Sequence, residues 1–230
     1  KTGAPLVHTY HTLYEQYASY VIPSKTIGDK LVAIMSRERL EHVDAIIAPT
    51  GKVKEALENY NIKNKIAVIP TGIAIRKFSS NISYEDTMAL KESLGIPSDN
   101  DILISIGRLG TEKNIGELIK NFSELCKIRD NVYFVIVGGG PAEEELRALS
   151  TSLNLDNRII FTGMVKPDEV SRYYNLGDIF VCASTSETQG LTYIEAMANF
   201  LPLVCRKDPC LDGVIIDEIN GVQYTNSEEY

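Results

Sequence analysis

From residue 101 onwards, short apolar runs alternate with segments of helical spacing. The runs "DILISIGR" (101–108) and "NVYFVIVGGG" (131–140) are rich in β-branched residues and indicate strands. Between them, residues 114–128 repeat apolar side chains every three or four positions, which predicts a helix. Strands that are apolar along their whole length are buried on both faces, as in a parallel sheet covered by helices. We therefore expect a doubly wound α/β domain.

The same alternation continues to the end of the chain and is also present before residue 75. The later pattern predicts helices at 141–153, 166–177, 191–200 and, as a short one, 213–219, with strands at 157–163, 178–184 and 201–206. The earlier part contains strand-like runs at 5–12, 45–50 and 65–74, with a helix after the second.

Two α/β units follow from this pattern. We assign residues 1–75 to the C-terminal part of a first Rossmann-like domain, 76–93 to a linker and first helix, and 94–230 to a second Rossmann-like domain. The chain opens on a strand without a start signal and closes on a strand and a polar tail. We therefore expect part of a longer protein, truncated at both ends and catalytically incomplete by itself.

The charge and composition exclude several classes of protein. A formal net charge of −8 argues against a nucleic-acid partner. No run approaches the roughly 20 apolar residues that span a bilayer. The four cysteines form no C-x-x-C pair, and the three histidines are distant from them in sequence. We expect no metal site.

Glycines and cations gather where the predicted strands end. "GRLGTEKN" follows the strand at 101–108 and contains Arg108 and Lys113, which can hold phosphate, although two solvated cations are an equal alternative. "VIVGGGP" could admit a nucleotide or could simply be a tight turn.

Two carboxylates flank the start of the helix at 191–200. Glu187 precedes it, and Glu195 lies within an apolar run, where a carboxylate needs a polar partner. Both could accept hydrogen bonds from ligand hydroxyls, with an anionic group at the helix N-terminus between them. Alternatively, Glu187 is solvated and Glu195 pairs with a cation.

Taken together, these segments resemble the retaining nucleotide-sugar glycosyltransferases of family 4, which have the two-domain GT-B fold. The similarity rests on Glu187 and Glu195, which are separated by seven residues, and on "GRLGTEKN", "VGGGP", "FTGMV", "PTGI" and "YHT" in the family's order. Within the family, "HTYHTLYEQY" and "TSETQGLTYIEAMA" are most similar to bacterial 1,2-diacylglycerol 3-glucosyltransferases.

The resemblance implies a role for each matching residue. It makes His11 and Glu187 the catalytic-site residues, with His11 reaching the donor sugar and Glu187 binding its hydroxyls rather than attacking as a nucleophile. It assigns Glu195 to the ribose hydroxyls. It assigns the donor diphosphate and sugar to Arg108, Lys113, Gly190, Leu191 and Thr192, and the nucleotide to Gly139, Met164 and Val165.

The resemblance also implies the reaction. A hexose, expected to be glucose, would pass from a UDP-sugar to a membrane lipid such as diacylglycerol, with no cofactor or metal. The protein would be cytoplasmic and peripheral on the inner face of the membrane. A polysaccharide or another lipid as acceptor, or a non-catalytic nucleotide-sugar-binding domain, remains an alternative.

Three local features qualify this interpretation. Ala74 stands where the family often has Asp, so we assign no role there, and Asn199-Phe200 replaces a usual Gly, so that helix end must be capped differently. Tyrosines at 10, 14, 17 and 20 have the spacing of one helix face, which is either packed or lines a lipid site. The basic residues Lys25, Lys30, Arg37 and Arg39 add weak support for contact with an anionic membrane.

Overall fold

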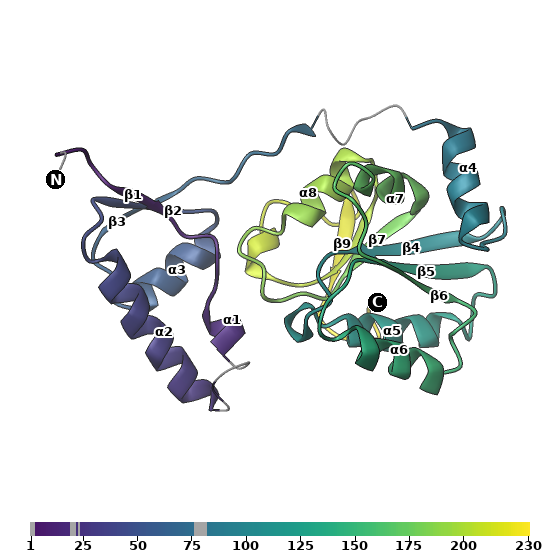
Figure 1. The fold of residues 1–230 in the computed structure, drawn as a ribbon, viewed down its shortest axis with the longest axis horizontal. Coiled ribbons are helices and arrows are strands. Elements are labelled where there is room, and N and C mark those ends of the chain that lie inside the picture. The colour runs from purple at the N-terminus through teal and green to yellow at the C-terminus, as the bar shows by residue number, and fades with distance from the viewer. Residues whose placement is uncertain (1–2, 19–21, 23, 76–81) are drawn as a thin grey trace. The chain divides into compact units, whose positions relative to one another are not determined.

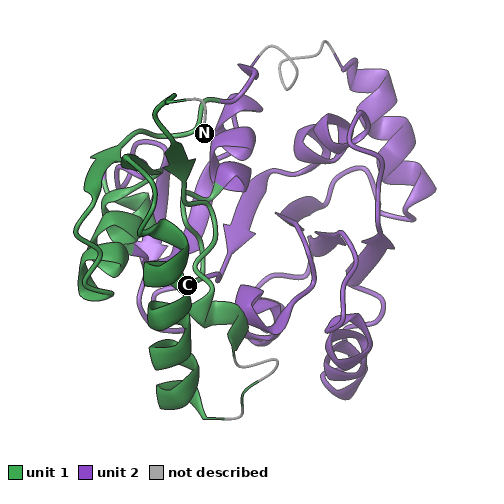
Figure 2. Ribbon diagram, turned by 60° about the vertical axis from the view of Figure 1, so that its left-hand side comes forward, with its two compact units in different colours: residues 1–72, 186–190, 209–212 green, residues 73–185, 191–208, 213–230 purple. Residues whose placement is uncertain are grey.

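The computed structural model describes residues 3–18, 22, 24–75 and 82–230, and it contains two compact units. Unit 1 comprises residues 1–72, 186–190 and 209–212, and unit 2 comprises 73–185, 191–208 and 213–230 (Figure 2). Both units are built from parallel strands and helices, which confirms the α/β prediction.

Unit 1 is a three-stranded parallel sheet in the order β1-β2-β3. Its helix α3 begins where Thr50, the N-cap, accepts a hydrogen bond from the backbone N–H of Val53. Leu40, Ile46 and Leu57 are fully buried and form the core with their neighbours. Its elements are β1 (Val7–Thr9), α1 (Glu15–Ala18), α2 (Lys25–Leu40), β2 (Ala45–Ala48), α3 (Gly51–Asn59), β3 (Lys65–Val68) and the 3-10 turn η3 (Pro209–Leu211).

Unit 2 is a six-stranded sheet, entirely parallel, in the order β6-β5-β4-β7-β8-β9. Helices α5 and α6 lie on one face of it, and α7 and α8 lie on the other (Figure 1). Its elements are α4 (Tyr84–Ser93), β4 (Asp101–Ile106), the 3-10 turn η2 (Thr111–Lys113), α5 (Ile115–Leu125), β5 (Val132–Val137), α6 (Glu143–Ser152), β6 (Ile159–Gly163), α7 (Val170–Leu176), β7 (Ile179–Cys182), α8 (Leu191–Ala198), β8 (Leu203–Arg206) and β9 (Gly221–Tyr224).

The apolar periodicity of α5 places its side chains in the core of unit 2. Leu118, Ile119 and Phe122 are fully buried, and the Phe122 ring packs against Phe134 of β5 with 5.6 Å between centroids. Strand β5 is buried from Phe134 to Val137. This double burial is the reason why the strands are continuously apolar in sequence.

Two local predictions were wrong. Residues 213–219 form turns rather than a helix, because Gly213 and Glu218 both have left-handed backbone conformations, with φ of 74° and 62°. The Asn220 side chain holds these turns by accepting from the Ile216 N–H at 2.8 Å and donating to the Val214 carbonyl at 2.9 Å.

The tyrosine row is not one helix face either. Within the described residues, helix α1 covers Glu15–Ala18, and Tyr10 precedes it in the loop after β1. Tyr10 is 2% exposed, bonds the Ser36 hydroxyl at 3.0 Å, and packs edge-on against Tyr14. Tyr10 therefore belongs to the core of unit 1, and Tyr20 lies outside the described residues.

Candidate functional site

The order of the strands in unit 2 indicates where a ligand can bind. If the six strands are numbered 1 to 6 in chain order, their order across the sheet is 3-2-1-4-5-6. The first three strands extend to one side of β4 and the next three to the other side, so the switch point lies between β4 and β7. In open α/β sheets the crevice at the carboxyl ends of the strands, at this switch point, is the usual ligand site. Gly107 follows β4, Gly138 follows β5, and Gly163 ends β6, so the predicted position of the glycines at strand ends is confirmed.

The loops after β4 and β5 are joined backbone to backbone. The Leu109 N–H donates to the Gly139 carbonyl at 3.0 Å, and the Ala142 N–H donates to the Leu109 carbonyl at 2.9 Å. A Cβ at Gly138 would lie 1.9 Å from the Gly107 oxygen, and one at Gly140 would lie 2.4 Å from the Leu109 oxygen. These two glycines are therefore required by the close approach of the loops themselves.

Arg108 lies in the first of these loops and is paired with a carboxylate that sequence reasoning missed. Its Nη2 is 2.6 Å from Oε1 of Glu112, whose side chain is only 4% exposed, whereas the Arg108 side chain is 46% exposed. Glu112 therefore anchors Arg108 through this ion pair. The i,i+4 spacing of opposite charges was the signal that could have revealed the pair. Lys113, half-buried, ends the 3-10 turn η2.

Helix α5 begins just after this loop. Asn114 takes a left-handed conformation, with φ of 53°, and its side-chain amide donates to Glu117 at 2.6 Å. Glu117 also forms an ion pair with Arg206, at the end of β8. A carboxylate in the first turn complements the helix dipole, so the negative charge of Glu117 stabilises the N-terminus of α5.

The residues assigned to the nucleotide lie on the loops after β5 and β6. A Cβ at Gly139 would lie 3.0 Å from Cγ of Met164, so these two residues are neighbours. The Met164 side chain is 88% exposed, and Val165 is half-buried. The structure thus brings Gly139 and Met164 together beside the Arg108 loop, with which Gly139 shares a backbone hydrogen bond.

Helix α8 presents Leu191 and Thr192 in its first turn and Glu195 in its second. The Tyr174 hydroxyl donates to Oε2 of Glu195 at 2.9 Å and lies 3.4 Å from the Thr192 carbonyl oxygen. Burial raises the pKa of Glu195, and the hydrogen bond from Tyr174 opposes that rise. Sequence reasoning missed Tyr174, and no spacing rule links residues 21 positions apart on two helices.

The end of α8 explains how Asn199-Phe200 replaces the expected glycine. The Leu201 N–H bonds the Ala196 carbonyl at 3.1 Å, and the Phe200 N–H bonds the Met197 carbonyl at 3.0 Å. This is the Schellman pattern, whose C′ residue is left-handed. Phe200 occupies that position with φ of 62° and a side chain that is 91% exposed.

The remaining predicted residues, His11, Glu187 and Gly190, belong to unit 1. His11 follows β1 and is exposed, while Glu187 is half-buried. The segment 186–190 is held in this unit because Gln189 exchanges two hydrogen bonds with the Thr71 backbone, at 2.8 and 2.9 Å. The Thr50 hydroxyl also donates to the Thr188 carbonyl, at 2.6 Å.

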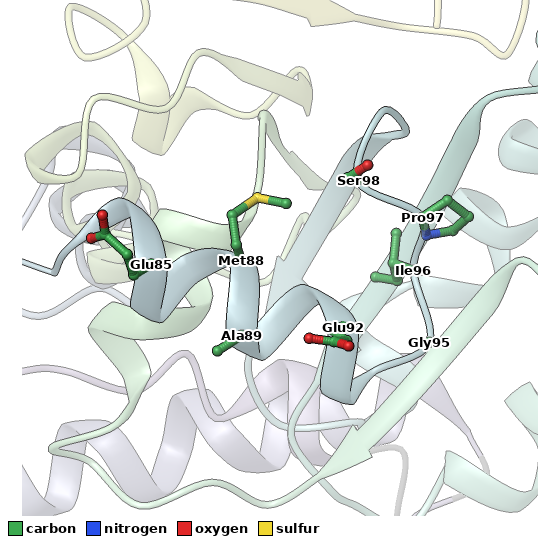
Figure 3. A pocket seen from close by; sticks show the side chains of 8 residues that line it. All are labelled: Glu85, Met88, Ala89, Glu92, Gly95, Ile96, Pro97 and Ser98. Atoms are coloured by element: carbon green, nitrogen blue, oxygen red, sulfur yellow. The ribbon is translucent and has the colours of Figure 1, made fainter.

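A separate cavity of about 610 Å³ lies between α4 and residues 95–98 (Figure 3). These residues precede β4, so the cavity is at the opposite end of the sheet from the Arg108 loop. Its charged lining residues are Glu85 and Glu92, which do not suit a diphosphate.

Two further observations concern metals and membranes. Over the described ranges of the chain, no three His, Cys, Asp or Glu side chains lie where they could hold a metal ion together. Within the same residues, no helix combines the length and the hydropathy that crossing a bilayer requires.

Two protein-family models match the chain. The model described as "Glycosyl transferases group 1" matches residues 86–229, and "Glycosyltransferase Family 4" matches residues 1–77. An alpha-monoglucosyldiacylglycerol synthase of Streptococcus pneumoniae is 38% identical over 96% of this chain and 50% of its own length. The enzyme of the same name from Acholeplasma laidlawii is 35% identical over 100% of this chain and 59% of its own. The chain therefore spans about half the length of these relatives.

Solved structures share the fold. Anabaena Alr3699/HepE in complex with UDP-glucose superposes with a TM-score of 0.81 at 22% identity, over 98% of this chain and 60% of that one. The sucrose-phosphate synthase of Thermosynechococcus elongatus gives 0.78 at 24% identity, over 96% of this chain and 55% of that one. These similarities confirm the predicted GT-B-type fold.

Proposed function

Because the chain belongs to the group 1 glycosyl transferases, we propose that the full-length protein transfers glucose from UDP-glucose to diacylglycerol in a membrane. The observation that carries this proposal is the 38% and 35% identity to two alpha-monoglucosyldiacylglycerol synthases over nearly the whole chain. The anomeric configuration of the sugar would be retained.

The donor diphosphate would bind at the carboxyl ends of β4 and β7. Arg108, anchored by Glu112, and Lys113 supply cations on the loop after β4. The N-terminus of α8 adds backbone N–H groups from Leu191 and Thr192. Negative charge grows on the β-phosphate as the glycosidic bond breaks, and preorganised donors stabilise that charge in the transition state. In this proposal the cations do the work of a metal ion.

The ribose, the uracil and the transferred sugar of the donor would be held by acidic, apolar and glycine residues and by His11. Glu195 would accept hydrogen bonds from the ribose hydroxyls, and Gly139, Met164 and Val165 would lie against the uracil. In unit 1, Glu187 and Gly190 would bind the transferred sugar, and His11 would reach it as well. These assignments rest on the family resemblance.

Donor binding is tested with the full-length protein and a panel of nucleotides and nucleotide sugars. A ligand that binds only the folded state raises the melting temperature by mass action. We expect UDP and UDP-glucose to raise it and the GDP and ADP counterparts to leave it unchanged. Lys113→Ala should abolish the shift, whereas Lys166→Ala, an exposed lysine before α7, should preserve it. A preference for GDP- or ADP-glucose would contradict the proposed donor.

The transfer itself is measured with radiolabelled UDP-glucose and vesicles that contain diacylglycerol. We expect a labelled monoglucosyl lipid whose anomeric proton has the α configuration by NMR, as in the donor. Soluble sugars and inositol phosphate serve as rival acceptors, because D-inositol 3-phosphate glycosyltransferases are also related to this chain, at 25–28% identity. Labelling of a soluble acceptor instead would overturn the lipid assignment.

The surface of α2 supports a location on a membrane. Ile27, Leu31, Ile34 and Met35 recur at helical spacing, and their exposed fractions are 61%, 43%, 44% and 60%. A helix that exposes an apolar strip can lie in the interface of a bilayer. Exposed basic residues of the same helix, Lys30 and Arg37 among them, would face anionic headgroups on the inner leaflet.

Flotation with anionic vesicles tests this surface. Ile27→Glu combined with Met35→Glu should release the full-length protein from vesicles. Ile128→Glu is the matched control, because Ile128 is 80% exposed but lies in unit 2, after α5. Equal flotation of the double variant and the control would refute membrane contact through α2.

A further inference from the structure

Tyr174 is a buried phenol whose hydroxyl contacts the carboxylate assigned to the ribose. It lies on α7, is 0% exposed, and donates to Oε2 of Glu195 at 2.9 Å. The carboxylate can only accept, so the phenol is the donor. Burial and the neighbouring Glu195 raise the pKa of Tyr174, so the phenol keeps its proton throughout the range in which an enzyme works.

The Tyr174 ring is held rigidly. It packs against Phe180 of β7 with 6.0 Å between centroids, and Phe180 packs edge-on against Tyr193 of α8 at the same separation. A second link between the helices lies beside it, where Asn175 donates to the Asn199 side chain at 2.8 Å. Asn199 in turn donates to the Glu195 carbonyl, also at 2.8 Å. Both the backbone and the side chain of Glu195 are thus fixed from α7.

One hydrogen bond leaves much of the carboxylate's capacity unused. A carboxylate has two oxygens with about four acceptor sites, and the Tyr174 hydroxyl occupies one of them. A carboxylate held at one oxygen cannot rotate freely about its last bond. It therefore presents its remaining sites in one orientation, which suits a pair of adjacent hydroxyls.

We propose that Tyr174 is a positioning residue that orients the Glu195 carboxylate toward the two ribose hydroxyls of the donor nucleotide. This inference rests on the proposed function, in which Glu195 receives the ribose. Tyr174 does not contact the ligand in this arrangement and acts only through Glu195.

The test compares two ligands with the full-length protein, UDP and its 2′,3′-dideoxy analogue. Tyr174→Phe should weaken UDP binding by about three- to tenfold, since one hydrogen bond that orients the Glu195 carboxylate is lost. The same variant should bind the dideoxy analogue as the unmodified protein does. Tyr193→Phe is the matched control, because Tyr193 is equally buried, packs on the same Phe180, and bonds the Cys182 sulfur instead. It should bind UDP within about twofold of the unmodified protein.

A pH profile gives a second, independent measurement. The Tyr174 hydrogen bond opposes the rise in the pKa of Glu195, so its removal should move the loss of UDP affinity on acidification to a higher pH. Tyr193→Phe should not move it. A merely structural role for Tyr174 would weaken both ligands equally and leave the profile in place.

The possible outcomes separate the inference from the proposed function. If the unmodified protein binds UDP and its dideoxy analogue equally, or binds neither, the assignment of Glu195 to the ribose fails. If it prefers UDP but Tyr174→Phe keeps the whole preference and an unchanged pH profile, the proposed function stands and the inference about Tyr174 is overturned.

Discussion

The left-handed residue at the end of α8 leads to a prediction about stability. Phe200 has φ of 62°, a conformation in which the Cβ of an L-residue approaches the following carbonyl oxygen. Its side chain is 91% exposed, so replacing it removes almost no packing. Phe200→Gly should therefore stabilise the chain, although it deletes an aromatic residue.

The size of the effect is a difference between two terms. Relief of the left-handed strain contributes about 1–2 kcal/mol. The greater freedom of glycine in the unfolded chain costs about 0.4–1 kcal/mol. The net gain is then about 1 kcal/mol, which for a chain of this length raises the melting temperature by roughly 2–4 °C.

Urea unfolding followed by circular dichroism measures this gain, with the slope against denaturant expected to stay constant. Phe200→Ala is the control, because alanine also removes the ring but keeps the Cβ that causes the strain. The alanine variant should gain nothing. If alanine stabilises as much as glycine, the exposed ring and not the backbone is responsible, and the argument fails.

Three further predictions concern the site. Burial raises the pKa of Glu195, so the contribution of this group to folding stability is present below the unfolded pKa and is lost as pH rises through the folded pKa. Glu195→Gln should therefore be more stable than the unmodified protein at neutral pH, which thermal melts across pH measure. The same variant should bind UDP more weakly. Gly138→Ala forces the loops after β4 and β5 apart and should cost about 1–3 kcal/mol and most of the UDP affinity. The control Gly95→Ala, whose φ of 73° is also positive but which has open space around it, should keep that affinity. Arg108→Met removes the ion pair with Glu112, whose side chain is 4% exposed, and should cost about 1 kcal/mol. Failure of a second change, Glu112→Gln, to recover part of this loss in urea melts would contradict the role of Glu112 as an anchor.

Much of the fold could be predicted because the patterns of strands and helices depend on residues that are close together in the sequence. The strands of unit 2 are buried on both faces, so each appears in the sequence as an apolar run, and the helices between them follow the 3.6-residue period. The two errors arose where local patterns compete with tertiary contacts. At 213–219 an apolar segment is held in turns by Asn220. At Tyr10, a helix-like spacing is overridden by burial in the core of unit 1.

The roles given to Arg108, Lys113, Glu187 and Glu195 stay predictions that rest on a family pattern. The structure adds what surrounds two of them. Glu112 forms an ion pair with Arg108, and the Tyr174 hydroxyl donates a hydrogen bond to Glu195. The Arg108–Glu112 pair has the i,i+4 spacing of opposite charges and could have been found in the sequence, whereas the Tyr174–Glu195 contact could not.

The sequence by itself determined the alternation of strands and helices, and with it the parallel sheet and the ends at which the glycines lie. Burial, backbone geometry and helical period act over a few residues and so leave a trace in the order of the amino acids. Only the tertiary structure decided that Gly138 must admit the Gly107 carbonyl and that Tyr174 holds Glu195. Those contacts join segments that are distant in sequence, and their geometry exists only once the sheet has brought the segments together.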